Sequence, residues 1–345
     1  MQLILHPFDL PLRHPFTTSI DTHVVQHTLV VELRDGAHSG FGEATSNEYY
    51  GVTIESLCAV LESARGQIES YTLAEPVHFW QAMQSLLAEH PFAQCALDEA
   101  AHDLWGKRLG QPVYKLWGLS IDQLPPSDYT IGIDTIDRMV AKLAEFPGWP
   151  IYKIKLGTDD DVEIVHELRK HTDATFRVDA NTGWTAETTI ANARALRPLG
   201  VEFIEQPLPA DDWDGMQRVF AESVVPVIAD ESCIVESDVA RCEGYFHGVN
   251  IKLTKCGGLT PARRMIGKAR QLGLQVMVGC MLESTVGISA IAQLLPLLDY
   301  VDMDGAVLIS RDVASGVRVE RGLVIYPAEA GCGVKLLAPS DSQVG

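Results

Sequence analysis

TFRVDAN (175–181), VEFIEQPL (201–208) and VPVIADES (225–232) are three short, β-rich segments, and each carries an acidic residue near its end. Similar segments come before and after them: SDYTIGID (127–134), YKIKLG (152–157), GVNIKLTK (248–255), LQVMVGC (274–280) and YVDMDG (300–305). Helical patterns such as AETTIANARALRPL (186–199) lie between them. Eight strand candidates spaced by about 20–26 residues predict an α/β fold with a parallel (β/α) barrel rather than an open sheet.

The sequence on either side of this repeating region follows a different pattern. Two β-rich stretches, MQLILHPFDLPL (1–12) and HTLVVELRDGAHSGFGEA (27–44), precede helical segments around 52–66 and 92–108. We therefore expect an α+β domain over residues 1–126 and the barrel over 127–315. The strand-like VRVERGLVIY (317–326) is expected to return to the first domain, which makes 316–345 a C-terminal segment of that domain.

Composition and charge narrow the class of protein. The chain has 345 residues, of which 46% are hydrophobic, so a large core can be buried. Its formal net charge of -19 argues against nucleic acid or an anionic membrane as a partner. The seven cysteines form no CxxC pair, the N-terminus has no basic signal region, and no stretch approaches the roughly 20 apolar residues of a membrane span. We expect a soluble cytoplasmic protein with reduced thiols.

Three acidic residues recur once in each βα unit. Asp179, Glu205 and Asp230 follow one another at intervals of 26 and 25 residues, late in three neighbouring strands. The carboxyl ends of barrel strands converge on one face, so these carboxylates are expected to reach one ion. Hard oxygen ligands suit Mg²⁺, and the absence of histidine from these strand ends argues against zinc.

Lysines lie on both sides of the three acidic strands. Lys153 and Lys155 are two residues apart and therefore share one face of the second strand, and Lys252 ends the sixth strand. Two lysines flanking a metal can act on opposite faces of one carbon, and crowding by cations is expected to lower a lysine pKa into the range of a general base. The residues therefore indicate proton transfer at a carbon next to a carboxylate, through a metal-stabilised enediolate.

The combination of these motifs resembles the enolase superfamily, in particular its muconate lactonizing branch. K-I-K (153–155), VDAN (178–181), IEQPL (204–208), ADES (229–232) and NIKLTKCGG (250–258) occur in the family's order and at barrel spacing. The resemblance implies a capping domain over a (β/α)₇β barrel and Mg²⁺ on Asp179, Glu205 and Asp230. It also implies Lys155 and Lys252 as the acid/base pair, with Lys153 assisting, and a homo-oligomer as a possible assembly.

Within that branch, D-M-D (302–304) is similar to the Asp-x-Asp signature of dipeptide epimerases. The resemblance implies that Asp302 and Asp304 hold the α-ammonium of a dipeptide and that Thr130 contacts the substrate. The implied reaction inverts the C-terminal residue of an L,L-dipeptide. NIKLTKCGG also contains Lys255, but an offset of three reverses the strand face, so we expect Lys252 to be the catalytic residue.

One loop departs from the pattern of the epimerases that act on Ala-Glu. Those enzymes carry an arginine a few residues after the P-F of the first loop, whereas HPFTTSID places Asp21 there. A carboxylate favours lysine or arginine, so we expect a cationic residue at the inverted position, assisted by Glu48 in SNEYYG.

Other functions share the same residues. o-Succinylbenzoate synthase, N-acylamino acid racemase and muconate cycloisomerase use similar acids and lysines, but none needs to hold a free ammonium, so D-M-D argues against them. A non-enzymatic binding protein on this fold would be expected to lack a ligand or a lysine, and none is missing here.

Overall fold

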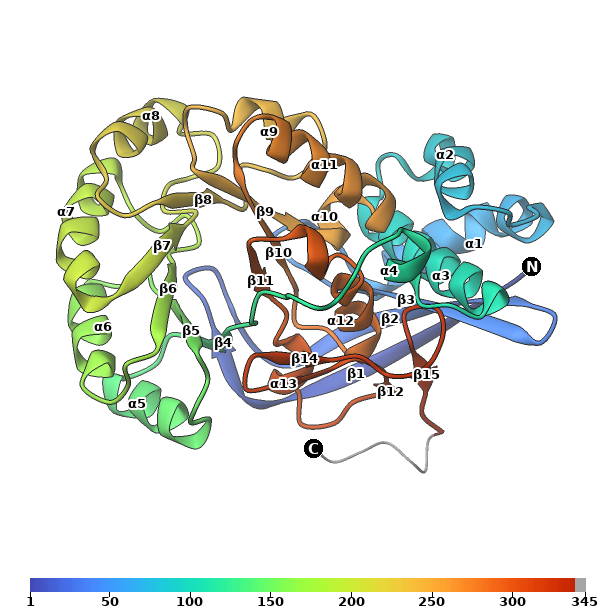
Figure 1. Ribbon diagram of the computed structural model, residues 1–345, viewed down its shortest axis with the longest axis horizontal. Helices are drawn as coiled ribbons and strands as arrows, with labels where there is room; N and C mark the ends of the chain where they lie inside the picture. The colour runs from blue at the N-terminus through green and yellow to red at the C-terminus, as the bar shows by residue number, and fades with distance from the viewer. Residues whose placement is uncertain (339–345) are drawn as a thin grey trace.

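The computed structural model describes residues 1–338. The predicted barrel is present as a parallel sheet of eight strands whose order follows the sequence, from β4 to β11 (Figure 1). The isolated parallel bridge between Ser127 and Val301 joins the first strand to the last. The strands are β4 (Tyr129–Ile131), β5 (Ile151–Lys155), β6 (Thr175–Asp179), β7 (Val201–Glu205), β8 (Val227–Ala229), β9 (Gly248–Lys252), β10 (Gln275–Gly279) and β11 (Tyr300–Asp302).

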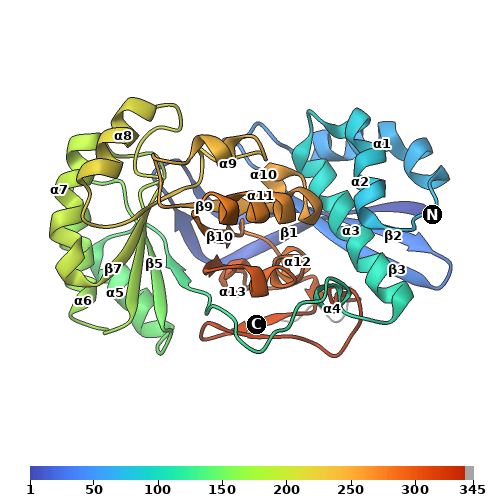
Figure 2. The same ribbon diagram turned by 45° about the horizontal axis from the view of Figure 1, so that its top comes forward.

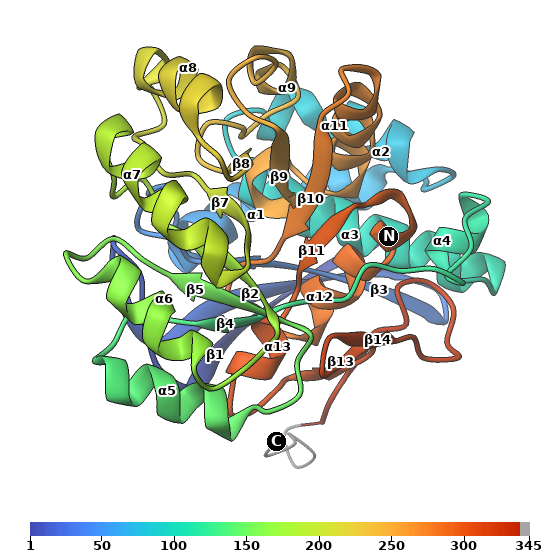
Figure 3. The same cartoon turned by 60° about the vertical axis from the view of Figure 1, so that its left-hand side comes forward.

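Helices cover the outside of the barrel strands (Figure 3). Their inward faces are apolar: in α5, for example, Met139 and Leu143 are buried, and the other residues are wholly or partly exposed. Burial of these faces against the strands forms the largest hydrophobic cluster of the described chain. The helices are α5 (Ile136–Glu145), α6 (Asp161–Arg169), α7 (Ala186–Leu196), α8 (Trp213–Glu222), α9 (Asp238–Arg241), α10 (Leu253–Cys256), α11 (Leu259–Gln271), α12 (Thr285–Ala292) and α13 (Gly305–Leu308).

The N-terminal residues form an antiparallel three-stranded sheet packed against helices (Figure 2). Close packing of α3 on β3 depends on Gly40 and Gly42, since a Cβ on Gly42 would lie 2.1 Å from the Ala96 carbonyl oxygen. This part has its own hydrophobic cluster. Its elements are β1 (Gln2–Thr17), β2 (Thr22–Asp35), β3 (His38–Thr45), α1 (Ile54–Ser70), α2 (Pro76–Leu87), α3 (Pro91–Leu109) and α4 (Val113–Leu116).

The C-terminal segment contacts both parts of the molecule. The hairpin of β13 (Arg318–Glu320) and β14 (Leu323–Ile325) lies against the barrel, where Gly322 O accepts a hydrogen bond from Ser127 N at 2.9 Å. The return to the N-terminal part is made farther on, where Cys332 N donates to Asp103 of α3 at 2.7 Å. Strand β12 (Ala314–Ser315), before the hairpin, pairs with β15 (Lys335–Leu336), after Cys332. The end of the predicted segment, 339–345, lies outside the described residues.

Two buried carboxylates of the N-terminal part fix its orientation on the barrel. Glu43 of β3 accepts hydrogen bonds from Ser284 Oγ at 2.6 Å and Gly287 N at 3.0 Å, at the start of α12. Asp98 of α3 accepts from Thr260 N and Oγ1, both at 2.8 Å, near the start of α11. The first N–H groups of a helix have no partner within the helix and favour a negative charge, so each carboxylate both satisfies and stabilises a barrel helix.

No helix among residues 1–338 is both long and apolar enough to cross a membrane.

Buried carboxyl groups at the interface between the N-terminal part and the barrel make the stability of the protein depend on pH. Burial raises the pKa of Glu99 and Glu283 well above the ordinary value, and repulsion from the Glu43 carboxylate acts in the same direction. The folded protein therefore holds these protons more tightly than the unfolded chain, and the stabilisation present in acid is lost as pH rises through the folded pKa. We predict that the free energy of unfolding falls as pH rises above the ordinary carboxyl value of 4.5, by up to about 1.4 kcal/mol per pH unit for each carboxyl, until the folded pKa is passed.

Urea unfolding at pH 5, 6, 7 and 8 measures this slope. The Glu99→Gln and Glu283→Gln variants should each flatten it, while the exposed Glu163→Gln should keep the slope of the native chain. An unchanged slope in the doubly substituted protein would contradict the prediction.

Candidate active site

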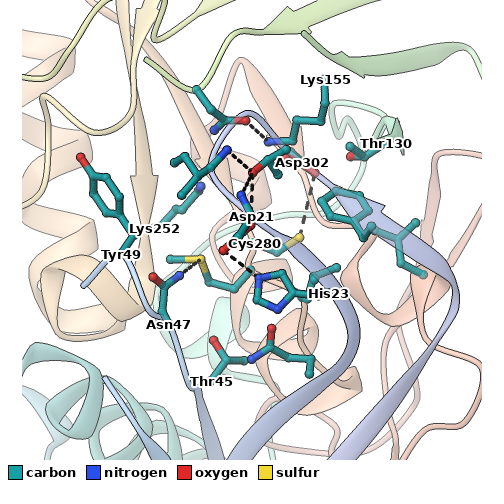
Figure 4. A pocket seen from close by; sticks show the side chains of 18 of the residues that line it. Asp21, His23, Thr45, Asn47, Tyr49, Thr130, Lys155, Lys252, Cys280 and Asp302 are labelled. Atoms are coloured by element: carbon teal, nitrogen blue, oxygen red, sulfur yellow. Dashed lines mark hydrogen bonds and ion pairs between the residues drawn. The ribbon is translucent and has the colours of Figure 1, made fainter. Parts of the chain in front are cut away.

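A cavity of about 130 Å³ lies between the N-terminal sheet and the carboxyl ends of the barrel strands (Figure 4). Its barrel side is lined by residues in or just after β4, β5, β6, β8, β9, β10 and β11, and its other side by the β1–β2 hairpin and the loop after β3. The lining residues include Asp21, His23, Asn47, Tyr49, Thr130, Lys153, Lys155, Asn181, Glu231, Lys252, Cys280, Asp302 and Asp304.

The tip of the β1–β2 hairpin closes one side of this cavity. Thr17 O accepts a hydrogen bond from Ile133 N at 2.8 Å, and Ser19 Oγ donates to Asn181 O at 2.9 Å. Gly157 has a φ of +121°, and a Cβ there would lie 2.8 Å from the Ser19 Cβ. Glycine at 157 therefore permits both the backbone conformation and the close approach of the hairpin.

The three predicted metal ligands are brought together. Asp179 and Glu205 end β6 and β7, Asp230 follows β8, and all three are fully buried. One carboxylate oxygen from each lies within 4.8 Å of the others. Within residues 1–338, Glu205 Oε2 accepts no well-formed hydrogen bond, although Lys153 Nζ lies 2.8 Å away. Three convergent carboxylates, one with an oxygen not satisfied by a hydrogen bond, fit a hard divalent cation such as Mg²⁺.

The lysines lie around this cluster as the strand order requires. Lys155 Nζ donates to Asp179 at 2.7 Å, from β5 on one side of the acidic strands. Lys252 Nζ donates to Asp230 at 2.8 Å, from β9 on the other side. Lys153 Nζ lies among Asp179, Glu205 and Asp302, at 3.1, 2.8 and 2.8 Å. The two predicted acid/base residues therefore approach the cluster from opposite sides.

The sequence led us to expect that a second lysine and the metal together lower the lysine pKa values. Among the protein's own groups, the neighbouring carboxylates act in the opposite direction. Burial lowers the pKa of Lys252, but the attraction of Asp230 raises it well above the ordinary value. For Lys153, burial likewise lowers the pKa, and Asp302 and Glu205 raise it more. The reason is that each ammonium group directly contacts carboxylates, whose attraction exceeds the repulsion between lysines.

Asp302 and Asp304 both reach the cavity but differ in their surroundings. Asp302 accepts a hydrogen bond from Lys153 at 2.8 Å, and although burial raises its pKa, Lys153 lowers it to about 2. Asp304 lies just beyond β11, and its Oδ2 accepts from Thr130 N at 2.5 Å. Burial and repulsion from Asp302 raise the pKa of Asp304 to about 8. The predicted contact residues Thr130, Asp302 and Asp304 are thus adjacent.

Of the two acidic loop residues expected to contact the substrate, Asp21 and Glu48, only Asp21 lines the cavity. Asp21 lines the cavity, and its Oδ2 lies 2.9 Å from His23 Nε2. Glu48 is exposed and is not among the residues that line the cavity. The loop after β3 contributes Asn47, Tyr49 and Tyr50 instead.

Two buried residues beside the carboxylate cluster, Lys255 and Asn181, were not assigned to the site from the sequence. Lys255 is fully buried and donates to Asp230 O at 2.6 Å and to the Asp230 carboxylate. Strand alternation did not predict this contact because the chain turns into α10 at Leu253, where the alternation no longer applies. Asn181 accepts a hydrogen bond from Lys155 at 3.1 Å and donates one to Glu231 at 3.4 Å. It is the last residue of the VDAN motif, so its position two residues after Asp179 could have identified it from the sequence.

Fold and site together define a barrel enzyme of the enolase superfamily. The family profile "Mandelate racemase / muconate lactonizing enzyme, N-terminal domain" matches residues 3–118, and "Enolase C-terminal domain-like" matches residues 136–340. The chain belongs to this family.

Relatives and solved structures refine the comparison. A protein of Maribacter sp. named L-Ala-D/L-amino acid epimerase is 59% identical to this chain, and the match covers 97% of this chain and 99% of the relative. A protein of the same name from Flavobacterium johnsoniae is 56% identical, and the match covers 98% of this chain and 100% of the relative. The structure of the dipeptide epimerase from Cytophaga hutchinsonii, complexed with Mg and D-Ala-L-Val, matches with a TM-score of 0.92 at 26% identity, over 98% of this chain and 96% of that chain. The structure of the dipeptide epimerase from Methylococcus capsulatus, complexed with Mg and L-Arg-D-Lys, matches with a TM-score of 0.87 at 30% identity, over 96% of this chain and 98% of that chain.

The buried Lys255 is open to a direct test of its effect on Asp230. Lys255→Met removes the donor from a buried carboxylate oxygen, and loss of one partner of a buried pair costs about 3–5 kcal/mol. We predict a decrease of that size in the free energy of unfolding, measured by urea denaturation. The exposed Lys170→Met, which breaks a surface pair with Glu167, should cost less than about 1 kcal/mol. Equal effects of the two substitutions would contradict the role assigned to Lys255.

Proposed function

We propose that this protein is a Mg²⁺-dependent dipeptide epimerase that inverts the C-terminal residue of an L,L-dipeptide. The observation that carries the proposal is the placement of Lys155 and Lys252 on opposite sides of the three-carboxylate cluster, beneath one cavity. The names of the Maribacter and Flavobacterium relatives support the activity. Related structures containing Mg and dipeptides support the cofactor and the class of substrate.

Asp179, Glu205 and Asp230 would hold the ion. Bound there, Mg²⁺ supplies positive charge that stabilises the negative charge developing on the substrate carboxylate.

The lysines carry the proton. One lysine takes the α-proton from one face, the C–H electron pair moves into the carboxylate, and the other lysine returns a proton to the opposite face of the same carbon. The net reaction is inversion with no change in composition. Lys153, buried among Asp179, Glu205 and Asp302, supplies further positive charge beside the substrate carboxylate.

Asp302 and Asp304 would bind the α-ammonium of the dipeptide. Both lie at the edge of the cavity formed by the end of β11, next to Thr130. This pair favours a free N-terminus over the acylated nitrogen of an N-acylamino acid or the substrate of an o-succinylbenzoate synthase, since a neutral amide offers no charge to offset two carboxylates.

Isotope exchange tests this activity. In D₂O with Mg²⁺, we predict that L-Ala-L-Xaa dipeptides gain one deuterium at the C-terminal α-carbon and invert, observed by mass spectrometry and NMR. Lys155→Met and Lys252→Met should each lower epimerisation at least about 100-fold, and each should retain exchange with only one diastereomer. Lys170→Met is the control. Exchange into N-succinyl amino acids but into no dipeptide would replace this proposal with an N-acylamino acid racemase.

We further propose that Asp21 favours a lysine or arginine at the inverted position. Its carboxylate lies in the cavity, where it can pair with a cationic side chain. Asp21→Asn should lower kcat/KM for L-Ala-L-Lys by about five- to tenfold and change that for the similarly shaped L-Ala-L-Met by less than about twofold, since a partly exposed ion pair contributes about 1 kcal/mol. Equal losses for both peptides would contradict a role in selectivity.

A further inference from the structure

The side chain that pairs with Asp21 is itself part of the cavity. His23 Nε2 lies 2.9 Å from Asp21 Oδ2, and both residues line the space between the hairpin and the barrel (Figure 4). The two side chains are 26% and 28% exposed, so both retain contact with solvent. Thr18 Oγ1 donates to the other oxygen of Asp21 at 3.2 Å, which fixes the carboxylate beside the histidine.

This pairing gives the cavity two charge states. Histidine changes its charge between about pH 5 and 8, whereas the side chains of lysine and arginine in a substrate stay cationic throughout. Protonated His23 would neutralise Asp21 and repel a cationic substrate side chain. Neutral His23 would leave the negative charge of Asp21 to the substrate.

We propose that His23 is a specificity-determining residue that sets how strongly Asp21 selects a cationic side chain. This inference rests on the epimerase activity proposed above. At acidic pH the cavity accepts neutral and cationic side chains with similar efficiency, and the preference for lysine or arginine develops as His23 loses its proton.

Other charged groups face the same cavity and must be separated from this effect. Asp302 and Asp304 face it from the end of β11, Lys153 and Lys155 from β5, Lys252 from β9 and Glu231 from the loop after β8. We assign these groups to the chemistry or to the common parts of the dipeptide. Their titration, like that of the substrate ammonium, therefore affects cationic and neutral substrates alike and cancels in a ratio of kcat/KM values.

The remaining titratable side chains of the cavity stay uncharged in the relevant range. Burial raises the pKa of Tyr49, raises that of Tyr50 to about 12, and raises that of Cys280 well above the ordinary thiol value. A change in selectivity between pH 5.5 and 8.5 therefore reports on the histidine and its aspartate.

The chain offers a matched control on the same strand. His27 Nδ1 lies 2.6 Å from Asp9 Oδ1, and both side chains are largely exposed and do not line the cavity. His27→Gln removes a similar histidine–aspartate pair from the same hairpin without changing the cavity.

The experiment measures the ratio of kcat/KM for L-Ala-L-Lys to that for L-Ala-L-Met from pH 5.5 to 8.5, with the full chain and Mg²⁺. We expect the ratio to rise by about fivefold in the native protein and in His27→Gln, since a partly exposed charge pair is worth about 1 kcal/mol. In His23→Gln the ratio should be high and independent of pH. In Asp21→Asn it should stay below that of the native protein at pH 8.5, because no carboxylate remains beside the histidine to attract the substrate side chain. His23→Asn provides a second uncharged variant.

Two results would overturn the inference while leaving the epimerase activity intact. One is a ratio that does not change with pH in the native protein. The other is a rise that persists in both His23→Gln and His23→Asn. Failure of the native protein to epimerise either peptide would instead overturn the proposed function, and this inference with it.

Discussion

Asp179, Glu205 and Asp230 place three carboxylates within a few ångströms of one another in a region closed to solvent. Removing one ion from water costs several kcal/mol even after relaxation, so such a cluster persists only if opposite charge surrounds it. Three lysines from β5 and β9 contact these carboxylates, and Lys255 holds the far side of Asp230. The same requirement that keeps the cluster stable also places ammonium groups on both sides of it, at the wall of the cavity.

Charge compensation continues below the cavity, inside the barrel. Arg177 pairs with Asp128 and with Glu202, both at 2.9 Å, and its guanidinium lies 5.2 and 5.0 Å from the rings of Phe203 and Tyr300. Asp128 contributes to the attraction that raises the pKa of Lys153. The barrel interior therefore contains acidic and basic side chains in alternation, namely Glu202, Arg177, Asp128 and Lys153, rather than only apolar ones.

The cavity exists only because the N-terminal part is held at a fixed orientation on the barrel. Glu43 and Asp98 bind the starts of α12 and α11, and Ser19 attaches the hairpin tip to the loop after β6. The three carboxylates and the lysines thus belong to the barrel strands and the turns that follow them, while Asp21 and His23 come from the hairpin. Substitutions in the hairpin can therefore change one wall of the cavity without altering the residues at the ends of the barrel strands.

The barrel, the three carboxylates and the lysines of β5 and β9 followed from the sequence by itself, because a strand repeat of fixed handedness brings every strand end to one face whatever the loops do. The expected domain limits at 126 and 315 rest on the same repeat. Only the tertiary structure decided what lies outside that regularity. Lys255 reaches Asp230 because the chain enters α10 at Leu253. Glu48 is exposed and does not line the cavity, whereas Asp21 lines it and pairs with His23. Irregular loops and turns obey no period, so their contacts depend on long-range packing that sequence spacing does not encode.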